Sequence, residues 1–351
     1  MQLSIRRFSN GSRGAHNARR AWAVRSGLLL ELQAGSLRGL GEAAPLPGYS
    51  TDTLDDAETA LRALDPYALE SAVDIDDANE ALRSVVDLLP PTQPAARMAL
   101  ETAALDLRGQ RNHLSAPAIL GAESGAARPL AWLAGAPDAL ALETIRGAQR
   151  AGYRHFKLKL GRVGQFEAEI AGVRALRRAL GTGPRLRLDA NRGWSEAQAG
   201  SAATLLEAQD IEFIEEPTPG LTRHRGASIP VALDESLRGL DPQDLEALAE
   251  RSGASFVVLK PMVLGGLSHC IDLARHAASL NLGVVVSHSF DGPVALMAAA
   301  ALALALPTRL AQGLAPHAGL AGWPHIPLPI RDATLQVWQS AGLGLASELF
   351  E

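Results

Sequence analysis

The stretch His155–Gly161, HFKLKLG, places two lysines two residues apart in an otherwise apolar run. Because side chains alternate between the two faces of a β-strand, Lys157 and Lys159 share one face and Leu158 lies on the other. A helical pattern follows over Phe166–Leu180. This unit, a short β-rich run and then a helix, decides the fold because it recurs along most of the chain.

Eight runs of this kind are predicted as strands. They are PLAWLAG at 129–135, RHFKLKLG at 154–161, RLRLDAN at 185–191, IEFIEEP at 211–217, PVALDES at 230–236, SFVVLKP at 255–261, GVVVSHS at 283–289 and RLAQGL at 309–314. Helical patterns lie between them, among them Ser195–Ala208, Pro242–Ser252 and Gly266–Leu280. Eight such units predict an α/β fold, a (β/α)8 TIM-type barrel. A doubly wound open sheet is the alternative, but no glycine-rich phosphate turn follows the first strand.

The first part of the chain has another pattern and predicts an N-terminal α+β capping domain. Its predicted strands are LSIRRF at 3–8, LLLELQ at 28–33 and LRGLGEA at 37–43, and its predicted helices lie near 52–64, 76–88 and 95–111. The segment Pro45–Thr51 is rich in proline and glycine, so we expect a loop there, one that covers the site. We expect the capping domain over 1–115, the catalytic barrel over 116–327, and a C-terminal segment, 328–351, that packs back on the capping domain.

Composition and charge exclude several classes of protein. The net charge of −5 gives no electrostatic reason to expect a nucleic-acid or membrane partner. Cys270 is the single cysteine, which excludes a disulfide within the chain and fits a helix-packing residue. The N-terminus lacks the apolar core of a signal peptide, and the apolar run Val294–Leu306 is too short to span a bilayer and predicts a buried helix. We expect a cytoplasmic protein, and the sequence does not indicate its oligomeric state.

Five consecutive predicted strands end in an ionisable residue on the same face. In chain order they are Lys159, Asp189, Glu215, Asp234 and Lys260. Catalytic side chains of a barrel come from these strand ends, so we expect the five to converge. A salt bridge at the start of a loop would explain any one of these residues. It would not explain why five consecutive strands all end in an ionisable residue on the same face. The alternate residues should face the helices; these are Leu158, Leu188, Ile214, Leu233 and Leu259.

The three carboxylates in this series predict a bound cation. Two carboxylates 4 Å apart repel each other by about 4 kcal/mol at an effective dielectric constant near 20. A divalent cation removes that repulsion, and an all-oxygen ligand set favours Mg2+, with Mn2+ as the other possibility. A hard cation beside two candidate bases suits the removal of a proton α to a carboxylate.

Lysine is rare in this chain, which makes its positions informative. Of the 33 lysines and arginines, three are lysine, namely Lys157, Lys159 and Lys260, and thirty are arginine. Arginine stays protonated in a protein, whereas a buried lysine can lose its proton and act as a base. The alternative explanation for these three positions is codon bias toward arginine, with three lysines left by chance. We expect Lys157, Arg187 and the cation to help Lys159 lose its proton.

Five motifs in this order resemble the enolase superfamily, in its muconate lactonising branch. They are FKLKLG, LDANRGW, FIEEP, ALDES and VVLKP, and the N-terminal run GLGEAAPLPGYSTDTLDDAE resembles the o-succinylbenzoate synthase family within that branch. The resemblance covers nearly the whole chain.

The resemblance implies a role for each matching residue. Asp189, Glu215 and Asp234 would ligate Mg2+. Lys159 would remove the α proton and later protonate the departing hydroxyl, while Lys260 on the opposite side stabilises the intermediate. The supporting positions of the same motifs are matched by Lys157, Asn191, Glu216 and Glu235.

The seventh predicted strand departs from the family pattern, because it continues as SHSFDGPVA. Ser287, His288 and Ser289 are candidates to bind the substrate carboxylate, although His288 could equally be a packed loop residue. His317, beside a proline, is interpreted as structural. Arg19 and Arg20 are either contacts for an anionic substrate or solvated surface residues.

These observations predict an enzyme that acts on a small carboxylate. The leading hypothesis is Mg2+-dependent dehydration of a cyclohexadiene carboxylate to o-succinylbenzoate, in menaquinone biosynthesis, through α-proton abstraction and a metal-stabilised enediolate. Racemisation of an N-acylamino acid, or another epimerase or cycloisomerase reaction of the branch, is the alternative; the Asp-x-Asp motif of dipeptide epimerases near the eighth strand is missing. A non-catalytic barrel would have no reason to keep the lysines and carboxylates, and a Schiff-base aldolase would leave the carboxylates unexplained.

Overall fold

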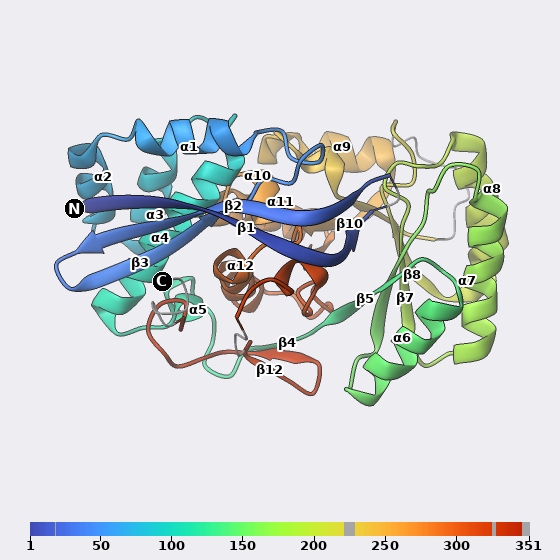
Figure 1. The fold of residues 1–351 in the computed structure, drawn as a ribbon. Coiled ribbons are helices and arrows are strands. Elements are labelled where there is room, and N and C mark those ends of the chain that lie inside the picture. Colours follow the sequence, from blue (N-terminus) through green and yellow to red (C-terminus); the bar gives the residue numbers. More distant parts are fainter. Residues whose placement is uncertain (18, 221–228, 325–327, 346–351) are drawn as a thin grey trace.

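The computed structural model describes residues 1–17, 19–220, 229–324 and 328–345. This part of the chain contains a three-stranded antiparallel sheet, a seven-stranded parallel sheet and a small three-stranded sheet. Figure 1 shows the antiparallel sheet with its helices beside the parallel sheet, and a long blue hairpin that reaches from one toward the other.

The hairpin belongs to the N-terminal sheet. This sheet consists of β1 (Gln2–His16), β2 (Ala21–Ala34) and β3 (Leu37–Ala43), paired in that order. Four helices follow it: α1 (Leu54–Arg62), α2 (Pro66–Val73), α3 (Ala78–Asp87) and α4 (Pro94–Asn112). Helix α4 lies directly on β3, because Gly41 has no side chain and a Cβ there would sit 2.0 Å from the Ala99 carbonyl oxygen. Helix α2 is an addition to the predicted elements.

The parallel sheet has the strand order β11-β10-β9-β8-β7-β6-β5. Its strands are β5 (Ala131–Gly135), β6 (His155–Lys159), β7 (Arg185–Asp189), β8 (Ile211–Glu215), β9 (Val231–Leu233), β10 (Ala254–Leu259) and β11 (Gly283–Val286). The helices that follow α4 are α5 (Ala116–Ile119), α6 (Ala139–Arg150), α7 (Phe166–Leu180), α8 (Glu196–Leu206), α9 (Leu245–Ser252), α10 (Pro261–Leu264), α11 (Leu267–Ser279) and α12 (Pro293–Ala305). The predicted α/β fold is confirmed as a curled parallel sheet.

The predicted eighth strand forms only isolated bridges to the two edges of this sheet. The Gly313 N–H donates to the Val286 carbonyl on the β11 side, at 2.8 Å, and the Ala131 N–H of β5 donates to the Gln312 carbonyl, also at 2.8 Å. The buried Gln312 side chain accepts the Val286 N–H in place of a backbone group. This substitution explains why residues 309–314 are an extended segment and not a regular strand.

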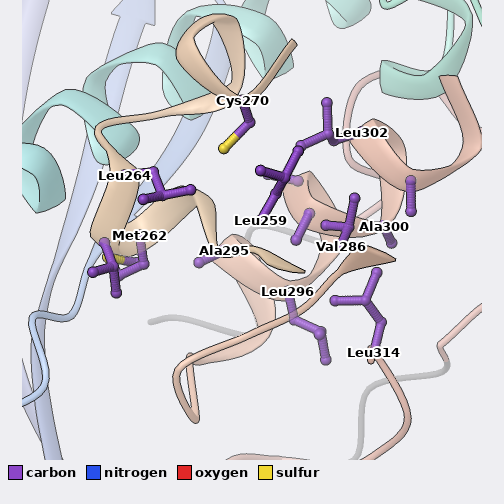
Figure 2. Packing of buried hydrophobic residues seen from close by; sticks show 14 of the residues in the cluster. Leu259, Met262, Leu264, Cys270, Val286, Ala295, Leu296, Ala300, Leu302 and Leu314 are labelled. Carbon is purple, nitrogen blue, oxygen red and sulfur yellow. The ribbon is translucent and has the colours of Figure 1, made fainter. Parts of the chain in front are cut away.

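The side chains of the parallel sheet alternate as predicted. Phe213, Ala232, Val258 and Val285 form their own small cluster. The alternate leucines and isoleucine belong instead to the main core, which includes the helices: Leu158, Leu188, Ile214, Leu233 and Leu259. Figure 2 shows Leu259 and Val286 against Ala295, Leu296 and Leu302 of α12, with Cys270 in the same cluster. This packing fixes which face of each strand carries the ionisable residues.

Helix α12 confirms the predicted buried helix in the apolar run from residue 294. Twelve of its thirteen residues are buried. No helix within the described ranges combines the length and apolarity that a bilayer crossing requires.

The C-terminal segment returns toward the N-terminal part of the chain. Strands β12 (Ile330–Arg331) and β13 (Thr334–Gln336) form a small antiparallel sheet with β4 (Ala127–Pro129). Farther along, the Leu343 N–H donates to Asp106 of α4 at 2.7 Å.

One buried arginine joins the N-terminal sheet to the loop that follows β11. Arg25 of β2 is 2% exposed. Its guanidinium donates to the carbonyls of Phe290 at 3.0 Å, Ala44 at 2.7 Å and Pro45 at 3.4 Å. Phe290 lies after β11, whereas Ala44 and Pro45 open the loop after β3, so a single side chain fixes two loops against each other.

A buried glutamate makes a second connection of the same kind. Glu42 of β3 accepts the N–H groups of Gly292 and Ala295 at the start of α12. Burial, together with the nearby Asp291, raises the pKa of Glu42 to about 7. A carboxylate at a helix N-terminus satisfies backbone donors that would otherwise be unpaired.

We expect Arg25→Met to destabilise the protein strongly. The substitution keeps a similar length but leaves three buried carbonyls without their donor, which should lower the free energy of unfolding by about 3 kcal/mol. Arg174→Met, at an exposed position on α7, is the matched control and should change it by less than about 0.5 kcal/mol. Equal unfolding midpoints for the two variants in denaturant would show that Arg25 does not hold the loops together.

Candidate active site

The strand register brings the predicted site residues to one edge of the parallel sheet. Lys159 of β6 lies opposite Asp189 of β7, which lies opposite Glu215 of β8. Asp234 directly follows β9, and Lys260 directly follows β10. All five side chains are buried. The structure therefore brings the five strand ends together, as predicted.

Two of the lysines are bonded to the three carboxylates. The Lys157 ammonium lies 2.9 Å from Asp189 and also contacts Glu215. The Lys260 ammonium contacts Asp234. Buried charges are stable only when they are paired, so these contacts explain how the carboxylates can be buried together.

Tyr49 completes the pair formed by Lys260 and Asp234. Its hydroxyl accepts from the Lys260 ammonium at 2.6 Å and lies 3.2 Å from both carboxylate oxygens of Asp234. Tyr49 comes from the loop 45–51, so the N-terminal part of the chain supplies a group that touches the site directly. Sequence reasoning did not single out Tyr49; the signal available was its place within the GLGEAAPLPGYSTDTLDDAE motif.

Three of the four residues predicted to support the site, Asn191, Glu216 and Glu235, lie behind the carboxylates; the fourth, Lys157, contacts two of the carboxylates directly. Glu216 accepts the backbone N–H groups of Asp234 at 2.9 Å and Ser236 at 2.8 Å. Asn191 donates from its backbone to Asp189 at 3.0 Å and from its side chain to Glu235 at 3.4 Å. Glu216 and Asn191 both have positive φ, of 38° and 46°. Non-glycine residues rarely adopt that conformation, so these turns hold the carboxylates at a cost in backbone strain.

The three lysines differ in how easily they lose a proton. Burial lowers the pKa of Lys159 to about 8, and Lys157 and Lys260 act in the same direction. Burial also disfavours the charged form of Lys157, but Asp189 and Glu215 outweigh it and raise the pKa of Lys157. Asp234 likewise outweighs burial at Lys260 and raises the pKa of that lysine. Lys159 is therefore the amine suited to act as a base near neutral pH.

Lys159 is covered by two loops. Its ammonium donates to the carbonyl of His16, at the tip of the hairpin formed by β1 and β2. The ring of Phe290, from the loop after β11, lies 5.1 Å from the same nitrogen. Both groups keep water from the amine, and desolvation of this kind lowers a lysine pKa.

A cavity of about 70 Å³ lies at this edge of the sheet. Its lining includes all three lysines, Asp189 and Glu215, and the loop residues Leu46, Tyr49, Ser287, His288, Ser289 and Phe290. Within the loop 45–51, which was predicted to cover the site, Leu46 and Tyr49 are buried and face the cavity, whereas Pro47 and Gly48 are exposed.

The two arginines near the hairpin tip connect loops. Arg19 donates to the carbonyl of Arg192, and Arg20 donates to the carbonyl of Pro47 at 2.8 Å. Both are exposed and neither lines the cavity. Of the two roles considered for them, these contacts fit surface residues that hold loops together.

The donor set at this edge fits a hard divalent cation, although the side chains do not form a ready metal cage. No three Asp, Glu, His or Cys side chains of the described ranges gather closely enough for that. Lys157 and Lys260 occupy the space between the carboxylates. Burial and the neighbouring Asp189 and Asp234 raise the pKa of Glu215 to about 7, and one oxygen of the buried Glu235 has no hydrogen-bond partner among the described residues.

Comparisons with known proteins agree with this geometry. Residues 140–348 match the family model described as enolase C-terminal domain-like, and residues 16–85 match the one described as MenC, N-terminal domain. The o-succinylbenzoate synthase of Yersinia pseudotuberculosis serotype O:3 is 33% identical over 322 residues, which cover 87% of this chain and 88% of that protein.

Solved structures show the same fold. The muconate lactonizing enzyme of Pseudomonas fluorescens, complexed with muconolactone, superposes with a TM-score of 0.87 at 25% identity, covering 98% of this chain and 95% of that one. The L-Ala-D/L-Glu epimerase of Bacillus subtilis gives a TM-score of 0.85 at 21% identity, with 98% of each chain covered.

A curled parallel sheet with lysines and carboxylates gathered at its carboxyl edge is the architecture of an α/β enzyme. The chain belongs to the enolase superfamily. Its similarity to o-succinylbenzoate synthases and to a muconate lactonizing enzyme agrees with the muconate lactonising branch that the motifs indicated.

The lysine pKa values can be measured directly, because the chain contains three lysines. We expect NMR of 13C- and 15N-labelled lysines, recorded with a chelator present, to show one side chain titrating near pH 8 and two that stay charged beyond pH 10. Single Lys→Arg variants assign the signals, and the one that titrates near pH 8 should disappear in Lys159→Arg. Three lysines that all titrate above pH 10 would contradict the assignment of Lys159 as the base.

Proposed function

We propose that this enzyme dehydrates a cyclohexadiene carboxylate to o-succinylbenzoate, a step of menaquinone biosynthesis in the cytoplasm. The single observation that carries the proposal is the pair of buried lysines at the cavity, Lys159 beneath the His16 carbonyl and the Phe290 ring, and Lys260 bonded to the Tyr49 hydroxyl. Similarity to named o-succinylbenzoate synthases over 87% of the chain supports the choice of substrate.

The reaction needs one base that returns its proton. Lys159, as the free amine, takes the proton from the carbon α to the substrate carboxylate. The carbon–oxygen bond at the next carbon then breaks, and Lys159 gives the same proton to the departing hydroxyl, which leaves as water while the ring becomes aromatic. The free amine of Lys159 can donate one N–H to the His16 carbonyl while its lone pair takes the substrate proton.

Lys260 acts in this scheme as a permanent cation. Its ammonium, held by Asp234 and Tyr49, stabilises the negative charge that develops on the substrate carboxylate. A racemase needs both lysines to exchange protons. The dehydratase is preferred to an N-acylamino acid racemase of the same branch because the relatives at 33% identity are named o-succinylbenzoate synthases.

The proposal includes Mg2+, held by Asp189, Glu215 and Asp234, with Mn2+ as a substitute. When bound, the ion supplies positive charge to the substrate carboxylate and takes over the charge compensation that Lys157 and Lys260 provide. Asn191, Glu216 and Glu235 keep the three carboxylates in place, and Ser287, His288 and Ser289 contact the substrate from the other side of the cavity.

We also propose that the parallel sheet closes into a (β/α)8 barrel, with residues 309–314 in the position of the eighth strand. Arg187 supports this, because its guanidinium reaches from β7 to the Ala311 carbonyl at 2.7 Å. The division into a capping domain, 1–115, a catalytic barrel, 116–327, and a returning segment, 328–351, belongs to the same proposal.

The direct test is turnover of the cyclohexadiene substrate, followed by ultraviolet absorbance of the aromatic product. We expect turnover with Mg2+ and its loss with a chelator. Asp189→Asn should keep the circular dichroism spectrum of the parent and lose metal-dependent turnover. Full activity in that variant, or activity that a chelator does not change, would exclude the metal assignment.

Arginine variants of the two lysines separate the dehydratase from the racemase. Lys159→Arg keeps the charge but cannot accept a proton, so dehydration should fall by more than the roughly 10²–10⁴-fold that is typical of one acid/base group. Lys260→Arg keeps the cation and should lose less. Turnover of an N-acylamino acid, with both variants inactive to the same degree, would favour the racemase instead. Near-normal dehydration by Lys159→Arg would show that Lys159 is not the base.

A further inference from the structure

Two histidines from different loops are stacked beside the cavity. His288 follows β11 and His317 follows the extended segment 309–314. Their ring centroids are 3.7 Å apart, with an angle of 28° between the planes. Phe290, which lies next to Lys159, packs against both rings, with its ring centroid 5.8 Å from that of His288 and 5.9 Å from that of His317. The pair is therefore close to the base.

The hydrogen bonds of the two rings define their tautomer. His288 Nδ1 accepts the N–H of Phe290 at 3.1 Å, and His317 Nδ1 accepts the N–H of Gly319 at 3.2 Å. A ring nitrogen that accepts a backbone N–H carries no proton, so the proton of each neutral ring is on Nε2.

Both rings are neutral at physiological pH. Burial, together with Arg25, lowers the pKa of His317 to about 3. Burial and the neighbouring His317 lower the pKa of His288 well below its usual value. The pair thus carries two uncharged N–H donors: His288 lines the cavity that holds the lysines, and His317 lines the depression beside it.

One of these donors has no partner. His317 Nε2 is shielded from solvent and makes no hydrogen bond to any group of the described residues. A shielded donor left unpaired destabilises the folded protein, so a purely structural histidine would be expected to use both nitrogens. The unpaired donor lies next to the cavity, which points to a hydrogen-bond acceptor on a bound ligand.

The space around the pair suits an arm of the substrate. The cavity that holds the lysines is small, about 70 Å³. A depression of about 700 Å³ adjoins it, sharing Lys159 and Phe290, and its lining includes His317, Arg13 and Arg162. An arm that leaves the cavity past Phe290 enters the depression that His317 lines.

We propose that His288 and His317 form a binding subsite for the oxygen-bearing arm of the substrate. Their Nε2 protons are donated to the keto oxygen or the carboxylate of a keto-acid arm, while the ring carboxylate stays at Lys159 and the strand-end carboxylates. This inference rests on the proposed function and adds the residues that select a substrate with a second acid group.

Neutral donors make this subsite selective. A cationic site would bind any anion, including inorganic ones, whereas two fixed N–H groups require an acceptor at a defined place. The two N–H groups bind the substrate arm equally strongly in the ground state and in the transition state. The subsite should therefore lower KM and leave kcat nearly unchanged.

The test compares two ligands and two variants by titration calorimetry with Mg2+ in the buffer. The ligands are o-succinylbenzoate and benzoate, which lacks the arm. His317→Phe keeps a stacked ring and removes the donor, so it should weaken o-succinylbenzoate about tenfold and leave benzoate unchanged. His317→Gln places an amide N–H near the former Nε2 and should recover most of the affinity. In turnover, the loss should be in KM.

Each outcome separates this inference from the proposed function. If the parent protein neither binds o-succinylbenzoate nor forms it, both fail. If the parent does so and His317→Phe binds it equally well, the subsite is excluded and the function stands. Equal losses for o-succinylbenzoate and benzoate would mean that His317 only supports the fold. Should His317→Phe not fold, His288→Phe is compared in the same way, with the same expected loss of selectivity.

Discussion

The site depends on the pairing of buried carboxylates with buried lysines at neighbouring strand ends. Asp189 and Glu215 are held by Lys157, and Asp234 is held by Lys260. The same arrangement leaves Lys159 without an ion-pair partner among the described residues, so burial lowers its pKa, whereas carboxylates outweigh burial and raise the pKa values of Lys157 and Lys260. The proposed division of work, with Lys159 as the base and Lys260 as a permanent cation, follows from where the carboxylates lie.

The N-terminal sheet takes part in this balance from a distance. The His16 carbonyl covers Lys159, and the Tyr49 hydroxyl bonds Lys260, so each flanking lysine has one contact from the N-terminal part of the chain. Arg25 and Glu42 fix the loops that carry Tyr49 and Phe290 against the start of α12. Movement of the N-terminal sheet relative to the parallel sheet would therefore alter the surroundings of both lysines together.

The sequence predicts the parts of this structure that are determined by local pattern. Helix α7 has the bounds that were predicted from Phe166 to Leu180, because its apolar face repeats over four turns. The strand-end residues were found because alternation within one strand places them on one face. Helix α2 was missed, since its eight residues are too few for a periodic pattern to stand out.

Contacts between distant segments could not be predicted in the same way. The Arg25 bond to Phe290 spans 265 residues and the Lys260 bond to Tyr49 spans 211, and a single chain gives no local sign of either pairing. Residues 309–314 were predicted as the eighth strand, but the buried Gln312 side chain, in place of a backbone carbonyl, accepts the Val286 N–H. His317 was interpreted as structural from its place beside a proline, and its stack with His288 is a contact between loops that the sequence does not show.

The central claim is that the three carboxylates now paired with lysines can exchange that pairing for a metal ion. Calorimetric titration with Mg2+ at pH 7, in buffers of different ionisation enthalpy, measures binding and proton release together. One ion should bind per chain with release of protons, because the pKa of Glu215 is raised to about 7 and a nearby cation lowers that of Lys159 further. Asp189→Asn should abolish both signals. Absence of Mg2+ binding, or binding that Asp189→Asn leaves unchanged, would contradict the account.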